Sequence, residues 1–459
     1  MKEMTKGNPL RLIIFFALPL LMGSLLQQMY SMMDAAIVGK YLGAGALGAV
    51  GSTTSVQFLV IGFCNGCCIG FCVPIAQRFG AHDLSTMRRY MFNGIIMTAI
   101  IAAAATVCCV VFTPNILHLL SIPDSIWANT RIYITIIFAG IPFTLLYNYS
   151  AGILRAVGDS RTPFIYLLIA SVTNIVLDIF CIRVLKLGCA GAAAATIISQ
   201  ALSGTLCTIT IIHRYEALHL RKEEMKMNAT MDKQLLIFGV PMGLQFSITA
   251  IGSMVLQSAN NSLGDVYISA MAAVGRIKGF AMSPFDAIAT ATSTFCSQNY
   301  GAGENERVRQ GFHVGMAIAV FYGIAAGTFL IFCGRNACML FLPASETLIL
   351  STAQKALYVS GYFYWILGIL NVCRLSVQGL GYSGRTIFSG VFEMCARCSM
   401  AIFMVPVLGY TAVCIADPFA WCLGGIYSFI TAVLLLRKIA PPHSAKPHFR
   451  PALSGSHGR

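Results

Sequence analysis

Charged residues are scarce in this sequence. They make up 10% of its 459 residues, whereas hydrophobic residues make up 57%, and the mean hydropathy is +0.75. A soluble globular chain carries about 25% charged residues. The shortage of charge therefore excludes a water-soluble globule and indicates a protein that lies in a lipid bilayer.

Histidine is also scarce, with eight residues, and only His313, near the end of an apolar segment, approaches the bilayer interior. An intramembrane enzyme needs paired His ligands or a Ser/His arrangement, so enzymatic activity is not expected.

Cysteine is plentiful by contrast, but the C-x-x-C pairs Cys64/Cys67 and Cys395/Cys398 lie inside apolar segments and lack a second pair to complete four ligands. We expect free thiols between packed helices, no metal bound by cysteine and no cofactor.

Long apolar segments dominate what is present. About 20 residues are needed to cross a bilayer as a helix, and the sequence has roughly twelve stretches of that length. None of them alternates with the period of two of an outer-membrane barrel strand. The sequence therefore predicts an all-α polytopic membrane protein with twelve transmembrane helices, near residues 11–38, 48–76, 91–113, 130–152, 163–183, 189–212, 234–258, 266–297, 311–333, 348–376, 387–407 and 412–436.

The positive charges indicate the orientation of the chain. Most of the 31 Lys and Arg residues fall in the two tails and in the connections that follow even-numbered segments. The positive-inside rule then places both termini in the cytoplasm, and we expect a multi-pass protein of the plasma (inner) membrane. The net charge of +14 reflects attraction to an anionic leaflet, so no nucleic-acid partner is expected.

The two halves of the sequence resemble each other at an offset of about 222 residues. "FALPLLMG" at 16 aligns with "FGVPMGLQ" at 238, "ALGAVG" at 46 with "AMAAVG" at 270, "AQRFGA" at 76 with "SQNYGA" at 297, and "AVGDSRT" at 156 with "GLGYSGRT" at 379. Matches that occur in the same order at nearly one offset indicate a duplication. We therefore predict two units of six spans each.

Six is an even number, so the two units share one orientation and form parallel repeats. Secondary transporters have this arrangement, with the substrate path between the units. We predict an N-terminal lobe at 1–212, a cytoplasmic linker at 213–233, a C-terminal lobe at 234–436 and a basic cytoplasmic tail at 437–459. A duplicated structural or receptor scaffold is the alternative, but it leaves the acids within the spans without a task.

Only five of the 17 acidic residues lie within the apolar segments: Asp34, Asp178, Asp286, Glu393 and Asp417. An ionised side chain at the bilayer centre costs about 2.5 to 3.5 kcal/mol. Such residues usually face a cavity or a partner. These five acids are therefore the first candidates for a functional site.

Two of these acids have a polar residue on the same helix face. Asp34 follows Tyr30 by four residues, and Asp178 follows Asn174 by four. If the first and fifth spans meet, these groups form an oxygen-rich pocket suited to H⁺ or Na⁺. Two nearby carboxylates in a low dielectric disfavour double ionisation, so at least one could bind a proton at the working pH. The alternative is that a neighbouring hydroxyl or amide holds each aspartate for helix packing alone.

The other acids allow two interpretations. Glu393 has Arg397 four residues later, the spacing of an ion pair within one helix, and a structural or a functional role is open. Arg276 and Lys278 lie in the same span as Asp286, and whether they neutralise it is also open.

The first span contains a proline. Pro19 interrupts the hydrogen-bond ladder and permits a bend that would move Asp34 relative to the fifth span, although a static kink fits equally.

Asp417 precedes Pro418 near the outer end of the twelfth span, where access to water lowers the cost of its charge.

The connection "GDSRTPF" has the chemistry of a turn. Thr162 is expected as the N-cap of the fifth span, with Pro163 at its first helical position. Asp159 is expected to have no role in transport.

Several of these motifs, in this order along the chain, resemble the multidrug and toxic compound extrusion (MATE) family. They are "ALPLL" with Asp34 fifteen residues after its proline, "AQRFGA" closing the second span, "RAVGDSRTP" after the fourth and "NIVLD" in the fifth. The resemblance covers nearly the whole chain, from about residue 5 to 436. It implies a V-shaped pair of six-helix lobes and export of organic, often cationic, compounds driven by inward movement of Na⁺ or H⁺.

The resemblance also implies site residues. The cation site in the first lobe of the family matches Asp34, Asn174, Asp178, Asn148 and Thr196 here, and the proline of its bent first helix matches Pro19.

The second lobe departs from the family. Some members have an acid early in the seventh span, whereas here that span has Gln245 and no carboxylate, so a cation site of that type is in doubt. Asp417, which the repeat offset places opposite Thr196, is the alternative acid of this lobe.

We therefore expect a secondary active transporter that exports organic cations by antiport against H⁺ or Na⁺, acting as a monomer in the lipid bilayer. The alternative within transport is a lipid-linked oligosaccharide flippase of a related family. Such a flippase should have several cations lining its cleft, and here the cations within spans are few, chiefly Arg276, Lys278 and Arg397.

Overall fold

The computed structural model describes residues 3–120 and 122–439. Most of the basic tail predicted for 437–459 therefore lies outside the described residues. The helices of the first half are α1 (Pro9–Leu42), α2 (Ala44–Ser52), α3 (Thr54–Gly80), α4 (Leu84–Val111), α5 (Thr113–Leu119), α6 (Asp124–Ala139), α7 (Ile141–Ala156), α8 (Arg161–Ile179), the π-helix η1 (Phe180–Val184), α9 (Gly188–His213) and the 3₁₀ turn η2 (Glu216–Leu218).

The second half is also helical. Its helices are α10 (Ala229–Asn261), α11 (Asp265–Gly301), α12 (Asn305–Cys338), α13 (Thr347–Gly379), α14 (Ser383–Ser399), the π-helix η3 (Met400–Met404), α15 (Val405–Leu408) and α16 (Tyr410–Lys438).

Twelve helical segments have the length of a membrane span within the described residues. Ten helices are long and apolar enough to cross a bilayer, and α6 with α7 forms an eleventh segment that bends by 43°. The twelfth is α11, whose 37 residues are less apolar because they include Arg276, Lys278 and Asp286. The prediction of an all-α polytopic membrane protein is confirmed.

Backbone chemistry explains several of the ends and breaks. Asn8 accepts a hydrogen bond from the N–H of Leu10 at the start of α1, and Asn228 caps α10 in the same way. The bend between α6 and α7 lies at Gly140, next to a helix start that contains Pro142, a residue without an N–H donor. The π-helix η1 ends the fifth span, and η3 lies near the end of the eleventh, where only the short helix α15 follows it.

The N-cap predicted at Thr162 is wrong. The carboxylate of Asp159 accepts hydrogen bonds from the backbone N–H groups of Arg161, at 3.1 Å, and Thr162, at 3.0 Å. The helix α8 therefore begins at Arg161, two residues earlier than predicted, and Pro163 is its third residue rather than its first. Its second oxygen accepts a bond from the Tyr215 hydroxyl at 2.7 Å. Burial opposes the charge of Asp159, but these hydrogen bonds outweigh it and hold the pKa of that carboxyl below its ordinary value.

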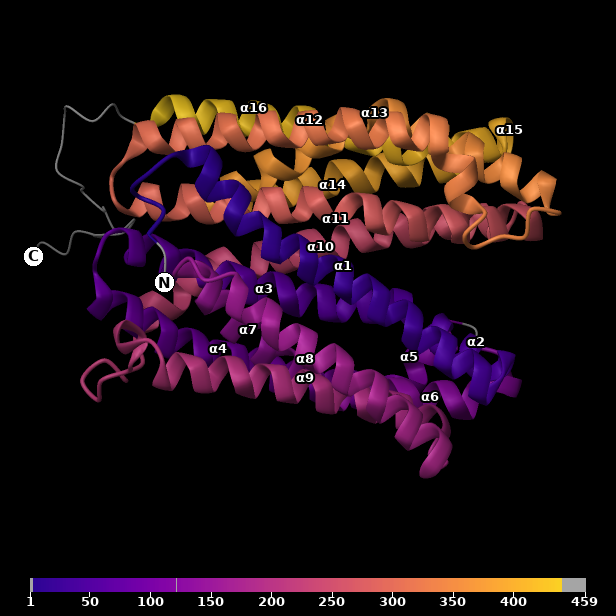
Figure 1. Ribbon diagram of the computed structural model, residues 1–459, viewed down its shortest axis with the longest axis horizontal. Helices are drawn as coiled ribbons and strands as arrows, with labels where there is room; N and C mark the ends of the chain where they lie inside the picture. Colours follow the sequence, from indigo (N-terminus) through magenta and orange to yellow (C-terminus); the bar gives the residue numbers. More distant parts are fainter. Residues whose placement is uncertain (1–2, 121, 440–459) are drawn as a thin grey trace, which may run out of the picture.

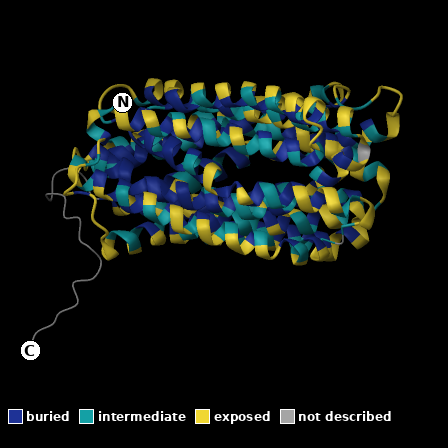
Figure 2. Cartoon of the chain, turned by 90° about the horizontal axis from the view of Figure 1, so that it is seen from below, coloured by how far each residue is buried: buried dark blue, intermediate teal, exposed yellow. Residues whose placement is uncertain are grey.

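The helices gather in two groups that follow the two halves of the sequence. Figure 1 shows α11 to α16 together along one side and α3 to α9 along the other. The larger hydrophobic cores follow this division except at Leu235 of α10, since one runs from Leu256 to Ile439 and the other from Val56 to Leu235. Buried residues are concentrated between the groups toward the end at which α1 begins (Figure 2).

The helix α1 contacts both groups. Its first part packs through Ile13 and Phe16 against Phe295 of α11, whereas Val38 near its end packs in a cluster with residues of α6 and α9. Pro19 lies between these two parts. A bend at this proline therefore changes the position of the end of α1 relative to the second group.

A buried ion pair fixes the loop between the two halves. The Arg88 guanidinium donates to both oxygens of Glu224, at 2.6 and 2.7 Å, and both side chains are at most 7% exposed. These hydrogen bonds hold the pKa of the Glu224 carboxyl below its ordinary value. Folding thus favours the carboxylate, and the stabilisation is present above the unfolded pKa of about 4.3 and is lost as the pH falls through the lower folded value.

Replacement of Glu224 is expected to destabilise the fold. Glu224→Gln should lower the free energy of unfolding by about 1.5 to 3 kcal/mol at neutral pH, because it removes charge-assisted hydrogen bonds. The difference from wild type should shrink as the pH falls below about 4.3. Thermal unfolding followed by tryptophan fluorescence measures both effects. Glu223→Gln, at the exposed neighbouring position, should leave the unfolding temperature unchanged, and equal shifts in the two variants would contradict the interpretation.

Candidate functional site

Two carboxylates meet inside the first half of the chain. Asp34 lies on α1 and Asp178 in the last turn of α8, and their side chains are close enough to interact electrostatically. Asp178 is 0% exposed and Asn174, one turn earlier on α8, is 1% exposed. The site is therefore a pair of acids of which Asp178 is fully buried and Asp34 is half-buried.

The polar atoms of this pair are poorly satisfied. Among the described residues, both oxygens of Asp178, one oxygen of Asp34 and the whole amide of Asn174 are buried without a hydrogen-bond partner. An ionised carboxylate only accepts hydrogen bonds, so two of them cannot satisfy each other. A proton shared between them, or a small cation coordinated by these oxygens and the amide oxygen, would satisfy them.

Hydroxyl groups complete the surroundings of the acids. Tyr30 lies one turn before Asp34 and near Thr196 on α9. Tyr133 of α6 lies near Asp34 and Tyr30, and also near Gln57 of α3. Tyr133 was not predicted, because no acid lies within one helical turn of it in the sequence to distinguish it from a packing residue.

Asn148 and Pro19 line a cavity between α1, α7, α8 and α11. This cavity has a volume of about 140 Å³ and is also lined by Arg155 and Asp286. The amide of Asn148 donates to the Thr144 carbonyl of its own helix at 2.8 Å. The residues matched by resemblance are thus divided between the acid pair and this neighbouring cavity.

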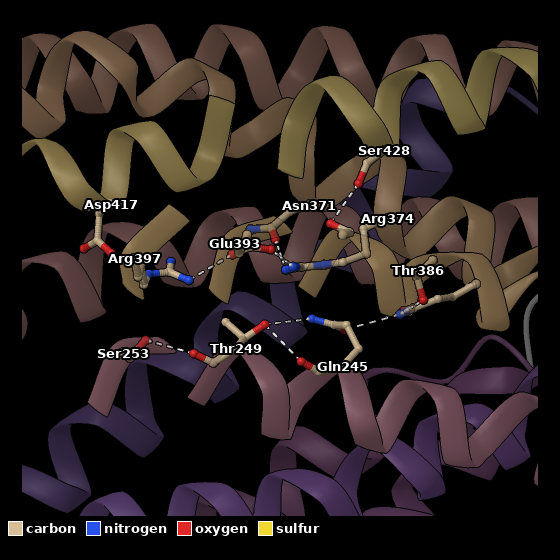
Figure 3. Close-up of polar contacts among 12 residues, drawn as sticks. Gln245, Thr249, Ser253, Asn371, Arg374, Thr386, Glu393, Arg397, Asp417 and Ser428 are labelled. Carbon is tan, nitrogen blue, oxygen red and sulfur yellow. Dashed lines mark hydrogen bonds and ion pairs between the residues drawn. The ribbon is translucent and has the colours of Figure 1, made fainter. Parts of the chain in front are cut away.

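The second half contains a chain of alternating charges (Figure 3). Arg397 bridges two acids, with its Nε 2.9 Å from Asp417 and its Nη1 3.4 Å from Glu393. Lys278 also binds Asp417, and Arg374 binds Glu393 at 2.8 Å. This network, composed of Lys278, Asp417, Arg397, Glu393 and Arg374, holds α11, α13, α14 and α16 together.

The network leaves its two acids fully engaged. Three cations surround two carboxylates, so a further cation near Asp417 or Glu393 would be repelled. Gln245 lies beside the network and its amide donates to Thr249 at 3.4 Å. The Glu393 and Arg397 pair anticipated from their spacing is present, whereas the partners considered for Asp286 lie elsewhere: Lys278 binds Asp417, and Arg276 lies over the ring of Phe341.

Two glutamines join the halves at the end where α1 begins. Gln77 of α3 donates to the carbonyl of Gly379, the last residue of α13, at 3.0 Å. Gln298 of α11 donates to the carbonyl of Ala156, the last residue of α7, at 2.8 Å. These are the residues that "AQRFGA" and "SQNYGA" align, so the contact is repeated by the internal symmetry. We call this pair of reciprocal bonds the glutamine clamp.

Glycines allow the helices to approach at the same interface. A Cβ on Gly80 would collide with the backbone of Gln298, and one on Gly301 would collide with the backbone of Gln77. Farther along α3, a Cβ on Gly66 would lie 2.7 Å from the Cα of Gly243 on α10. The two halves are therefore in backbone contact on this side.

The fold and its paired acids define a class, the two-lobed membrane transporters with duplicated helical units. The MatE family model matches the chain twice, at residues 19–180 and 241–403. The chain belongs to this family, whose members are multidrug efflux transporters rather than enzymes.

Individual relatives agree with this assignment. The chain is 30% identical over 307 residues to the probable multidrug resistance protein YpnP of Bacillus subtilis, covering 67% of this chain and 68% of the relative. It is 27% identical over 394 residues to the probable multidrug resistance protein YoeA of the same organism, covering 83% of each. A solved structure of a multidrug resistance MATE family transporter of the MOP superfamily, in an outward-facing conformation, superposes with a TM-score of 0.89 at 21% identity, covering 95% of this chain and 98% of that one.

Proposed function

We propose that this protein exports organic cations by antiport against H⁺ or Na⁺, and that Asp34 and Asp178 bind the coupling cation together with Asn174. The observation that carries this proposal is the pair formed by the buried Asp178 and the half-buried Asp34, in which both oxygens of Asp178 and one oxygen of Asp34 are buried without a hydrogen-bond partner among the described residues. The cost of placing such groups inside a membrane protein is offset if they bind a cation during the transport cycle. Tyr30 and Thr196 lie beside the same pair of acids.

Coupling requires that cation and substrate stabilise different states. The helix α1 provides a mechanical connection, since its first part packs on α11 and its later part carries Asp34 to α8. A cation between Asp34 and Asp178 would draw α1 and α8 together, and its release would free α1 to bend at Pro19. The first lobe would then change shape when it gains or loses the cation.

The two groups of helices act as lobes with an alternating opening between them. We assign residues 1–212 and 234–436 to the lobes, 213–233 to a cytoplasmic linker and 437–459 to a cytoplasmic tail. The glutamine clamp lies at the end where α1 begins, next to Arg78 and Arg155, and the excess of cations there supports a cytoplasmic position for this end and for both termini. In this state the substrate path is closed toward the cytoplasm. The membrane in which the protein lies is the plasma membrane.

Gradient-driven efflux from proteoliposomes tests the proposal. Export of a cationic rhodamine ester should rise when an inward H⁺ or Na⁺ gradient is imposed, and the gradient that acts identifies the coupling ion. Export that responds to neither gradient but requires ATP would contradict antiport. Membership of the MatE family and the multidrug resistance proteins among its relatives favour this function over an oligosaccharide flippase.

A further inference from the structure

Asp286 is an acid without a role in the site described above. It lies in the middle of α11, yet its side chain is exposed, because it faces the cavity shared with α1, α7 and α8. The basic residues near it in the sequence are engaged elsewhere, as described above. Arg374 of α13 is close enough to interact with it electrostatically, but its guanidinium already donates to Glu393 and Asn371.

Arg155 faces the same cavity from the opposite lobe. It lies in the last turn of α7 and also lines a second cavity between the lobes, which includes Met242 and Phe246 of α10. In the sequence Arg155 begins the motif "RAVGDSRTP" that follows the fourth span, a connection that the positive-inside rule places in the cytoplasm. Within the described residues, neither Arg155 nor Asp286 forms an ion pair or a hydrogen bond, with each other or with another side chain.

An unpaired carboxylate and an unpaired guanidinium in one inter-lobe cavity are complementary to a molecule that has both charges. From this we infer that Asp286 and Arg155 form a subsite for zwitterionic organic molecules, with the cationic group bound at Asp286 and the anionic group at Arg155. Asn148 and Thr290 contribute polar atoms to the walls, and Phe164 and Leu167 contribute an apolar surface for a ring system. The inference rests on the proposed export function, which it deepens by naming a substrate class.

The position of this subsite fits the transport cycle. The glutamine clamp joins Gln298 to Ala156, the residue next to Arg155, so the contact that closes this end is adjacent to one charged residue of the subsite. Arg155 and Asp286 also lie on different lobes. A bound zwitterion would therefore bridge the lobes, and opening of the clamp would move Arg155 and Asp286 apart.

A matched pair of dyes tests the subsite. Rhodamine B has a cationic xanthene and a carboxylate, and its ethyl ester keeps the cation but lacks the negative charge. Fluorescence polarisation with the purified full-length protein at neutral pH gives the Kd of each dye. Loss of a charge-assisted contact weakens binding by about tenfold or more.

Arg155→Gln should weaken binding of rhodamine B about tenfold or more and leave the Kd of the ester within about twofold, because only rhodamine B has the anionic group. Asp286→Asn should weaken both dyes, because both have the cation. Arg155→Lys, which keeps the charge, should retain most of the preference for rhodamine B. This rescue separates a charge effect from damage to the fold at the end of α7.

Three results would overturn the inference: wild-type protein that binds the ester but not rhodamine B, an Arg155→Gln variant that loses both dyes equally or neither, and an Asp286→Asn variant that binds both dyes normally. The proposed function fails separately. If neither gradient drives export while Arg155→Gln loses only rhodamine B and Asp286→Asn loses both dyes, antiport is wrong and the subsite stands.

Discussion

Asp34→Asn and Asp178→Asn are each expected to abolish gradient-driven export while the protein still binds its substrate. Each replacement removes one of the two carboxylates that face each other, so the cation loses a charged ligand and the site no longer links its occupancy to the shape of the lobe. Export should fall by about a hundredfold or more, to the level of passive leakage, because coupling of a few kcal/mol is lost. Efflux of a cationic dye from proteoliposomes measures this.

The same variants should be more stable than wild type. Burial of unpaired carboxylates costs free energy, and Asn has the same shape without the charge. We expect Asp178→Asn to raise the free energy of unfolding by about 1 to 3 kcal/mol when no coupling cation is present. Asp124→Asn, at an exposed acid at the start of α6, is the matched control and should change neither export nor stability. Loss of transport together with loss of stability would instead mean that the aspartates hold the helices together.

Removal of the glutamine clamp is expected to open the end that it joins. Gln77 and Gln298 are 6% and 0% exposed, and each donates to a backbone carbonyl of the opposite lobe. A hydrogen bond contributes about 1 kcal/mol, so the double variant Gln77→Ala with Gln298→Ala should favour opening of this end by about 2 kcal/mol, or about thirtyfold. Hydrogen–deuterium exchange of the connections at 80–84 and 301–305 should become faster by a similar factor.

A matched glutamine makes the clamp experiment specific. Gln310 lies exposed near the start of α12, and Gln310→Ala should leave exchange in both connections unchanged. Because the contact is repeated by symmetry, the two single variants should have comparable effects, each smaller than that of the double variant. Unchanged exchange in the double variant would mean that the glycine contacts alone hold this end closed.

The architecture could be predicted because each span has to satisfy its environment on its own. Lipid requires about 20 apolar residues per helix, and that requirement is visible in the sequence. The break at Gly140 and the π-helix η1 were not predicted, since both leave the hydrophobic pattern intact and depend on local backbone geometry. The same applies to the cap of α8, where Asp159 reaches the free N–H groups before Thr162 does.

The candidate site was accessible only in part. In-span acids are rare and costly, so Asp34 and Asp178 could be selected from the sequence, and the structure places them side by side. The partners that these acids and bases find on other helices could not be predicted, because nothing in the sequence pattern marks them. Lys278 lies near Asp286 in the sequence but binds Asp417, which is 139 residues away, and the position of Arg155 in a cavity depends on how two lobes meet.

Release of the coupling cation by substrate is the most direct test of the central claim. Purified protein is loaded at its coupling cation site, and the cationic dye is then added while released H⁺ is followed with a pH indicator or released Na⁺ with a radioactive tracer. Wild-type protein should release about one cation per molecule, because dye and cation favour different states, and Asp34→Asn and Asp178→Asn should release none. Two results would contradict the account: wild-type protein that binds the dye without releasing any cation, or variants that release as much cation as wild type does.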